Sequence, residues 1–129
     1  MSPTYETLTR SFESGAVDGA NFSHRDHVVV AYHMLRDDEF LSASYRYAQG
    51  IRTLAQAAGA PDKFNTTITL AFLSVIAERM QTTAHSDFDS FASANADLLE
   101  SGFVKNLYSS SRLQSALARQ VFLLPNKAA

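Results

Sequence analysis

At 129 residues the chain is long enough for one domain with its own apolar core, and a hydrophobic content of 46% argues against a disordered chain. The formal net charge is −2 and no basic cluster stands out, so nucleic acid and anionic membranes are poor candidates as partners. Because cysteine is absent, disulfides, thiolate nucleophiles and cysteine metal ligands are excluded. We expect a cytoplasmic protein, since the first ten residues lack an apolar signal region and no apolar run is long enough to span a bilayer.

Two helices are predicted in the first part of the chain. The first begins at Pro3 and ends near Gly15, the usual asymmetry of proline and glycine in a short helix. The second begins at Ser23 and ends near Arg36. We expect Ser23 and Asp26 to form a capping box, because they occupy the N-cap and N3 positions.

Two longer helices follow in the middle of the chain. A helix over residues 40–58 is favoured by the acidic run 37–39 at its N-terminus, and Gly59 with Pro61 ends it. The helix over residues 66–80 is apolar around almost its whole circumference. We therefore expect it to be the buried central helix and to contribute the most buried residues.

The last third predicts a short helix over residues 88–95, a turn that ends at Gly102, and a final helix over residues 111–122. No segment shows the alternation of a strand. The sequence thus predicts an all-α, single-domain bundle of five to seven helices around the helix at 66–80, with residues 1–129 forming one helical domain.

Two histidines stand three residues apart at the start of the second helix. At about 100° per residue, His24 and His27 share a face with the apolar Val28, whereas Val29 and His33 fall on the opposite face. We therefore expect His24 and His27 to point into the bundle. His33 is expected to face water and to titrate near its ordinary value.

Neighbouring imidazoles can bind a common ligand or transfer a proton. A zinc site needs at least a third protein ligand, and the spacing fixes none of the candidates Asp26, Glu78 and His85. The sequence therefore predicts no metal site. The alternative is structural, with both imidazoles bonded to carbonyls or water at a helix end.

Polar residues begin the otherwise apolar fourth helix. Asn65 or Thr66 would cap it; alternatively, Asn65 and Thr69 turn polar atoms into a pocket. There is no glycine-rich phosphate loop, G-x-S-x-G elbow or H-E-x-x-H motif, so the question of enzyme activity stays open.

Three segments carry a family resemblance. "FSHRDHVVVAYHML" is similar to a Phe-x-His-x-x-His helix start, "KFNTTIT" to a Tyr-His-x-Thr-x-Thr element, and "LYSSSRLQSALARQVFLLPN" to a Tyr-Ser segment with Ala-Arg that ends in Pro-Asp. With these segments the chain resembles a family of small uncharacterised bacterial proteins, which implies an all-helical domain and no known activity. Asn65 stands where that pattern has a histidine, and Asn126 where it has an aspartate. Asparagine is a poor ligand for zinc or iron.

Our first hypothesis is a small-molecule-binding domain whose polar pocket is lined by His24, His27, Asn65 and Thr69. The expected aromatic walls are Phe22, Phe64 and Tyr108. In an enzyme, His24 or His27 would be the catalytic acid or base, because no other side chain of a type that titrates near neutral pH is so placed. The second hypothesis is a non-catalytic structural or protein-interaction module, for example a homodimer. The sequence identifies no substrate or cofactor.

Protein purified without added metal is expected to contain well under one zinc, iron or nickel ion per chain, because the histidine pair lacks a third ligand at a fixed spacing. Elemental analysis of the purified protein measures this directly. A tightly held ion in every chain would contradict the prediction and favour a metalloenzyme.

Overall fold

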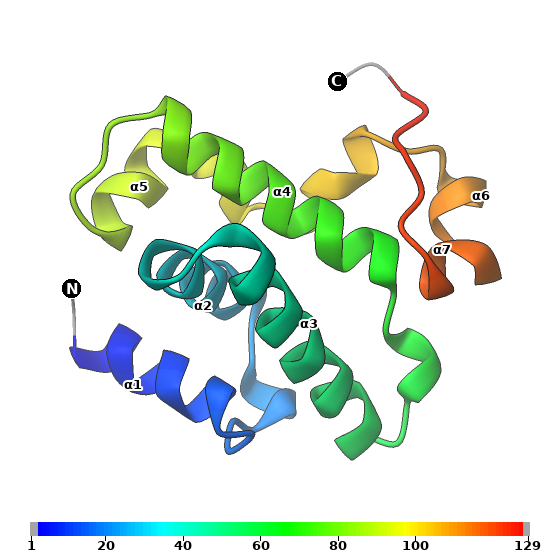
Figure 1. The fold of residues 1–129 in the computed structure, drawn as a ribbon, viewed down its shortest axis with the longest axis horizontal. Coiled ribbons are helices and arrows are strands. Elements are labelled where there is room, and N and C mark those ends of the chain that lie inside the picture. Colours follow the sequence, from blue (N-terminus) through cyan, green and yellow to red (C-terminus); the bar gives the residue numbers. More distant parts are fainter. Residues whose placement is uncertain (1–2, 128–129) are drawn as a thin grey trace.

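The computed structural model describes residues 3–127, which contain seven α-helices, four short 3-10 helices and no strand (Figure 1). The longer helices are α1 (Pro3–Glu13), α2 (His24–Asp37), α3 (Phe40–Ala57) and α4 (Thr66–Thr82). The shorter ones are α5 (Phe88–Ala94), α6 (Ser110–Leu113) and α7 (Ala116–Gln120), with η1 (Gly19–Asn21), η2 (Pro61–Lys63), η3 (Ala96–Leu99) and η4 (Phe103–Asn106) between them. The predicted all-α, single-domain fold is confirmed. None of these helices is long and apolar enough to cross a membrane.

Side-chain caps fix where the helices begin. The Ser23 hydroxyl accepts a hydrogen bond from the Asp26 amide and the Asp26 carboxylate accepts one from the Ser23 amide, so the predicted capping box is present. Glu39, the last residue of the acidic run, accepts hydrogen bonds from the first amides of α3. Asn65 does the same for α4. These local bonds explain why the sequence located the starts of three helices correctly.

Helix α2 occupies the middle of the fold and packs against α1, α3, α4 and α5 (Figure 1). Seven consecutive residues, 28–34, are buried, so over about two turns no side of this helix faces water. Helix α4 has six buried residues and exposes Ser74 and Glu78. The expectation that the helix at 66–80 contributes the most buried residues is therefore wrong. Several of its apolar side chains are only partly covered, because neighbours enclose α2 more completely.

His33 is 1% exposed, which contradicts the expectation that it faces water. Helix α1 covers this face of α2, with the Tyr5 ring 6.0 Å from the His33 ring, and Phe88 of α5 lies 6.2 Å away. The Nδ1–H group of His33 donates to the Val29 carbonyl at 2.8 Å. Its Nε2 atom is buried without a hydrogen-bond partner among residues 3–127. The helical wheel failed here because it does not show which face a second helix will cover.

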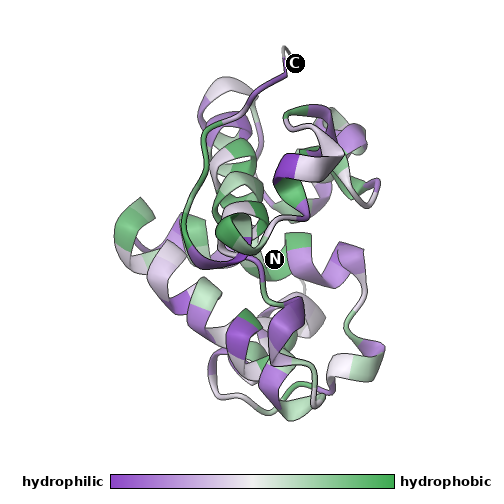
Figure 2. Ribbon diagram, turned by 90° about the vertical axis from the view of Figure 1, so that its right-hand side faces the viewer, coloured by the Kyte–Doolittle hydropathy of each residue, from purple (hydrophilic) through white to green (hydrophobic). Residues whose placement is uncertain are grey.

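The predicted final helix over 111–122 is divided into α6 and α7. Ser115 has extended backbone angles (φ −72°, ψ 155°), and its side chain accepts a hydrogen bond from the Ala118 amide. A serine inside the predicted helix thus ends one helix and caps the next. Figure 2 shows hydrophobic and hydrophilic residues together on most of the helices, as expected for helices with one buried face.

The chain after α7 returns along the start of α4. Thr66 donates a hydrogen bond to the Arg119 carbonyl at 2.9 Å. Thr67 donates to the Val121 carbonyl and accepts from the Leu123 amide. These bonds hold the C-terminal segment beside the N-terminal turn of α4, which is where the candidate site lies.

Gly50 lies where the Phe12 ring approaches the backbone of α3. A Cβ atom at this position would lie 2.4 Å from Cζ of Phe12. The Phe12 ring cannot easily move, because it packs on Phe22 and Tyr47 with centroid distances of 5.6 and 5.4 Å. Glycine therefore stands in the interior of a helix for a packing reason, not for a special backbone angle.

We expect Gly50→Ala to lower the free energy of unfolding by about 1–3 kcal/mol through overpacking, although alanine favours an isolated helix by about 1 kcal/mol. Urea denaturation measures the change. Gln56→Ala, at an exposed position of the same helix, is the control and should stay within about 0.5 kcal/mol. A stabilised Gly50→Ala protein would show that Phe12 shifts freely.

Candidate ligand-binding cavity

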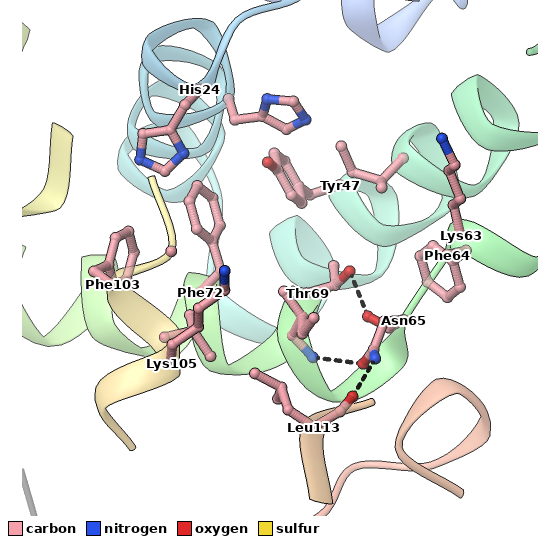
Figure 3. A pocket seen from close by; sticks show the side chains of 15 residues that line it. His24, Tyr47, Lys63, Phe64, Asn65, Thr69, Phe72, Phe103, Lys105 and Leu113 are labelled. Atoms are coloured by element: carbon pink, nitrogen blue, oxygen red, sulfur yellow. Dashed lines mark hydrogen bonds between the residues drawn. The ribbon is translucent and has the colours of Figure 1, made fainter. Parts of the chain in front are cut away.

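An open cavity of about 340 Å³ lies where the first turns of α2 and α4 meet the side of α3 and the 3-10 helix η4 (Figure 3). His24, His27, Asn65 and Thr69, the four residues that the sequence suggested, all line it. Such a volume lies at the lower end of the range of small-molecule sites. The structure thus brings together residues that are up to 45 positions apart in the chain.

His24 and His27 each hold one ring nitrogen against a backbone carbonyl. Nε2 of His24 lies 2.9 Å from the Leu98 oxygen, and Nδ1 of His27 lies 2.8 Å from the Ser23 oxygen. Because a carbonyl only accepts, these nitrogens carry the protons in the neutral rings. Nδ1 of His24 and Nε2 of His27 are then acceptors with no protein partner among residues 3–127. Each of the two histidines therefore uses one ring nitrogen to hold the fold and leaves the other nitrogen free.

Burial lowers the pKa of His27 below its ordinary value of 6.5, against the raising effect of its hydrogen bond to the Ser23 carbonyl. The Phe22 ring packs on the His27 ring at 4.4 Å. His27 is therefore neutral at pH 7 and presents an acceptor nitrogen. The nearby charge of a protonated His24 would lower the His27 pKa further.

Asn65 uses both ends of its side chain within the protein. Its oxygen accepts from the Ile68 amide and its nitrogen donates to the Leu113 carbonyl, each at 2.9 Å, and the Thr69 hydroxyl donates to the Asn65 carbonyl at 2.8 Å (Figure 3). The interpretation of Asn65 as a helix cap is thus confirmed. Asn65 forms part of the wall by joining α4 to α6, and Thr69 keeps its oxygen lone pairs as acceptors.

Three aromatic rings form a row along one wall. Phe72 stacks between Tyr47 and Phe103, with centroid distances of 5.9 and 5.4 Å and interplanar angles of 19° and 24°. The His24 ring meets Phe72 and Phe103 edge-on at 6.0 Å. This wall offers flat apolar contact area to a ligand. Of the expected aromatic residues, Phe64 lines the cavity.

The other two expected aromatic residues lie elsewhere. Phe22 packs behind His27 and against Phe12, and Tyr108 is buried with its hydroxyl donating to the Leu123 carbonyl at 2.7 Å. Neither residue lines the cavity. The prediction of Phe22 and Tyr108 as pocket walls is therefore wrong. It relied on their positions in the sequence next to polar motifs, and sequence spacing does not give the direction of a ring.

Tyr47 is a cavity residue that the sequence did not single out. It is 1% exposed, yet its hydroxyl has no hydrogen-bond partner among the described residues, and Figure 3 shows that oxygen turned toward the cavity. Burial raises the Tyr47 pKa well above 10, so the hydroxyl stays protonated and can donate. In the sequence, Tyr47 looks like one more residue of an apolar stripe, and no local motif distinguishes it.

The possible third metal ligands lie outside the cavity. Asp26 is held in the capping box, and Glu78 is exposed on α4. His85 bonds to the Tyr32 hydroxyl and the Met80 carbonyl instead. Within residues 3–127, no group of three or more histidine, aspartate or glutamate side chains is placed to hold a metal ion.

Comparisons with known proteins identify no relative. No protein-family model matches the chain, and no curated protein or solved structure matches it either. The family resemblance drawn from the three sequence segments therefore stays a prediction, and the function has to be inferred from the site itself.

The buried histidines should make stability depend on pH. Burial also lowers the pKa of His33, so His27 and His33 resist protonation in the folded protein and take up protons near pH 6.5 once unfolded. The contribution of these two neutral histidines to the free energy of unfolding is therefore expected to be fully present above about pH 6.5. It should be lost as the pH falls from about 6.5 toward the lowered pKa values of the folded protein. His33→Phe, which keeps a ring, should make this fall smaller in urea denaturation across pH. An NMR titration that places His33 at or above pH 6.5 would contradict this account.

Proposed function

We propose that this protein binds a small molecule in the cavity between α2, α3, α4 and η4. The observation that supports this most strongly is the convergence of unused polar atoms on an apolar space. The free ring nitrogens of His24 and His27 and the Tyr47 hydroxyl all belong to residues that line it. Polar groups that line an apolar cavity and have no partner within the protein are typical of ligand-binding sites.

Under this proposal, some of the lining residues provide apolar contact and others bind the ligand through hydrogen bonds. Phe72 and Phe103 provide apolar contact, while His24, His27 and Tyr47 orient the ligand through hydrogen bonds. Asn65 holds the wall to α6 through the Leu113 carbonyl, and the Thr69 hydroxyl donates to the Asn65 carbonyl at the start of α4. If the site also has catalytic activity, the free ring nitrogens of His24 and His27 are the atoms placed to accept a proton. We propose the cytoplasm as the location, which the absence of cysteine favours.

The alternative is a protein-interaction module, and one observation favours it. Large apolar side chains are exposed along a groove of about 470 Å³ between α3, α4 and the C-terminal segment. Among them, Leu41 is 75% exposed and Tyr45 is 66% exposed. Exposed apolar residues in one place are typical of interaction surfaces. Light scattering distinguishes the proposals, since a dimer that Leu41→Asp dissociates would favour the interaction module.

Binding to the cavity can be tested with N-phenyl-1-naphthylamine, a neutral aromatic dye whose fluorescence rises in apolar surroundings. We expect saturable binding to the wild-type protein. Ile68→Trp fills the cavity from α4 and should weaken binding about tenfold or more, equivalent to about 1.4 kcal/mol. Ile51→Trp fills it from α3 and repeats the test in case the first variant does not fold.

Leu41→Trp is the matched control, because it adds the same ring at an exposed position outside the cavity. Thermal melting of each variant establishes that it is folded. Dye binding that Leu41→Trp weakens and the cavity variants leave unchanged would place the dye on the exposed groove and contradict the proposal.

A further inference from the structure

The cavity is positively charged although the protein as a whole is negative. The chain carries a formal net charge of −2, yet none of its 13 aspartate and glutamate residues lines the cavity. Lys63 of η2 and Lys105 of η4 both do. They are two of the three lysines in the chain. The charge of the cavity therefore opposes that of the whole protein.

Neither lysine has its charge neutralised within residues 3–127. Lys63 and Lys105 form no ion pair with any described carboxylate, and Figure 3 shows them on opposite sides of the cavity. The chain of Lys105 lies over Gly102, where a Cβ atom would meet Cδ of Lys105 at 3.3 Å. Gly102 has a positive φ, which favours glycine, and a side chain at this position would crowd that of Lys105.

Other donors face the same space. The Tyr47 hydroxyl stays protonated and has no partner among the described residues. The first turns of α2 and α4 both contribute lining residues, and the N-terminus of a helix carries a partial positive charge. A carboxylate, sulfonate or phosphate would satisfy these donors, whereas a cation would find no carboxylate to bind.

The rest of the cavity wall is flat and apolar. Tyr47, Phe72 and Phe103 stack in a row, and a planar ligand body can continue this stack or lie along it. A small inorganic anion would leave this surface without contact. The ligand therefore needs both a charged group and an apolar body.

We propose that the ligand of the cavity is an organic anion with a flat, apolar body. Lys63 and Lys105 make the cavity favourable for a negative charge from opposite sides, the Tyr47 hydroxyl donates to the charged group, and the aromatic row contacts the body. This inference rests on the proposed binding function and specifies the class of ligand.

Two dyes with the same ring system test the inference. 8-Anilinonaphthalene-1-sulfonate carries a sulfonate, and N-phenyl-1-naphthylamine lacks it. We expect the sulfonate dye to bind about tenfold more tightly at low salt, and added salt to weaken that dye alone. Lys63→Gln combined with Lys105→Gln should remove the tenfold advantage and leave binding of the neutral dye unchanged.

Lys127→Gln is the matched control for the single variants Lys63→Gln and Lys105→Gln, because it removes one positive charge at the third lysine, which lies outside the cavity. It should leave both dyes unaffected. Tyr47→Phe should weaken binding of the sulfonate dye about threefold, because it removes a single donor. Since that hydroxyl has no protein partner among residues 3–127, the variant should fold normally, as circular dichroism can establish.

The outcomes separate the two proposals. Equal binding of both dyes, unchanged by the lysine substitutions, would overturn the anionic ligand and leave the cavity as a binding site. Binding of neither dye, or binding that Ile68→Trp and Ile51→Trp do not weaken, would overturn the proposed function and this inference with it. An equal effect of Lys127→Gln would attribute the preference to overall charge and overturn the role of Lys63 and Lys105.

Discussion

The enclosure of α2 is the constraint on which the rest of the fold depends. Seven consecutive residues of this helix are buried, and such a segment is stable only if other helices cover every side. Helices α1, α3, α4 and α5 provide that cover. Apolar side chains such as Val28 and Val30 explain part of the burial. The polar His33 is buried with them because its Nδ1–H group bonds to the Val29 carbonyl within the helix.

The same enclosure explains where the cavity lies. The first turn of α2, residues 24–27, precedes its buried segment 28–34, and the cavity opens beside this turn. His24 and His27 stand in that turn, which the Ser23 capping box begins. The first turn of α4 lies across from them and is held in place by Asn65 and by the C-terminal segment. The cavity is therefore framed by two helix starts, each stabilised by its own side-chain cap.

Hydrogen bonding within the cavity separates wall residues from residues that can bind a ligand. Asn65 has both ends of its amide occupied, so it already contributes fully to the fold. His24 and His27 each use one nitrogen for the fold and keep one free. The Tyr47 hydroxyl makes no bond to residues 3–127 and is turned toward the cavity. A ligand in the cavity can therefore accept a hydrogen bond from it without breaking a bond of the fold.

What the sequence determined by itself is the set of local features. Ser23, Glu39 and Asn65 start helices through bonds to amides within three residues, and the periodicity of apolar residues gave the four long helices and the all-α class. The pair of histidines three residues apart pointed to the helix end at which the cavity lies, because residues at that spacing share a face in any helix.

Only the tertiary structure decided which helix is enclosed and which residues meet across the chain. The burial of His33 depends on α1, which covers that face of α2. Tyr47 and Lys105 join the histidines through contacts between distant segments, which leave no periodic signal in the sequence. The physical reason is that a capping bond or a helical face involves neighbours in the chain, whereas a cavity is formed by the packing of elements whose order along the chain does not fix their positions in space.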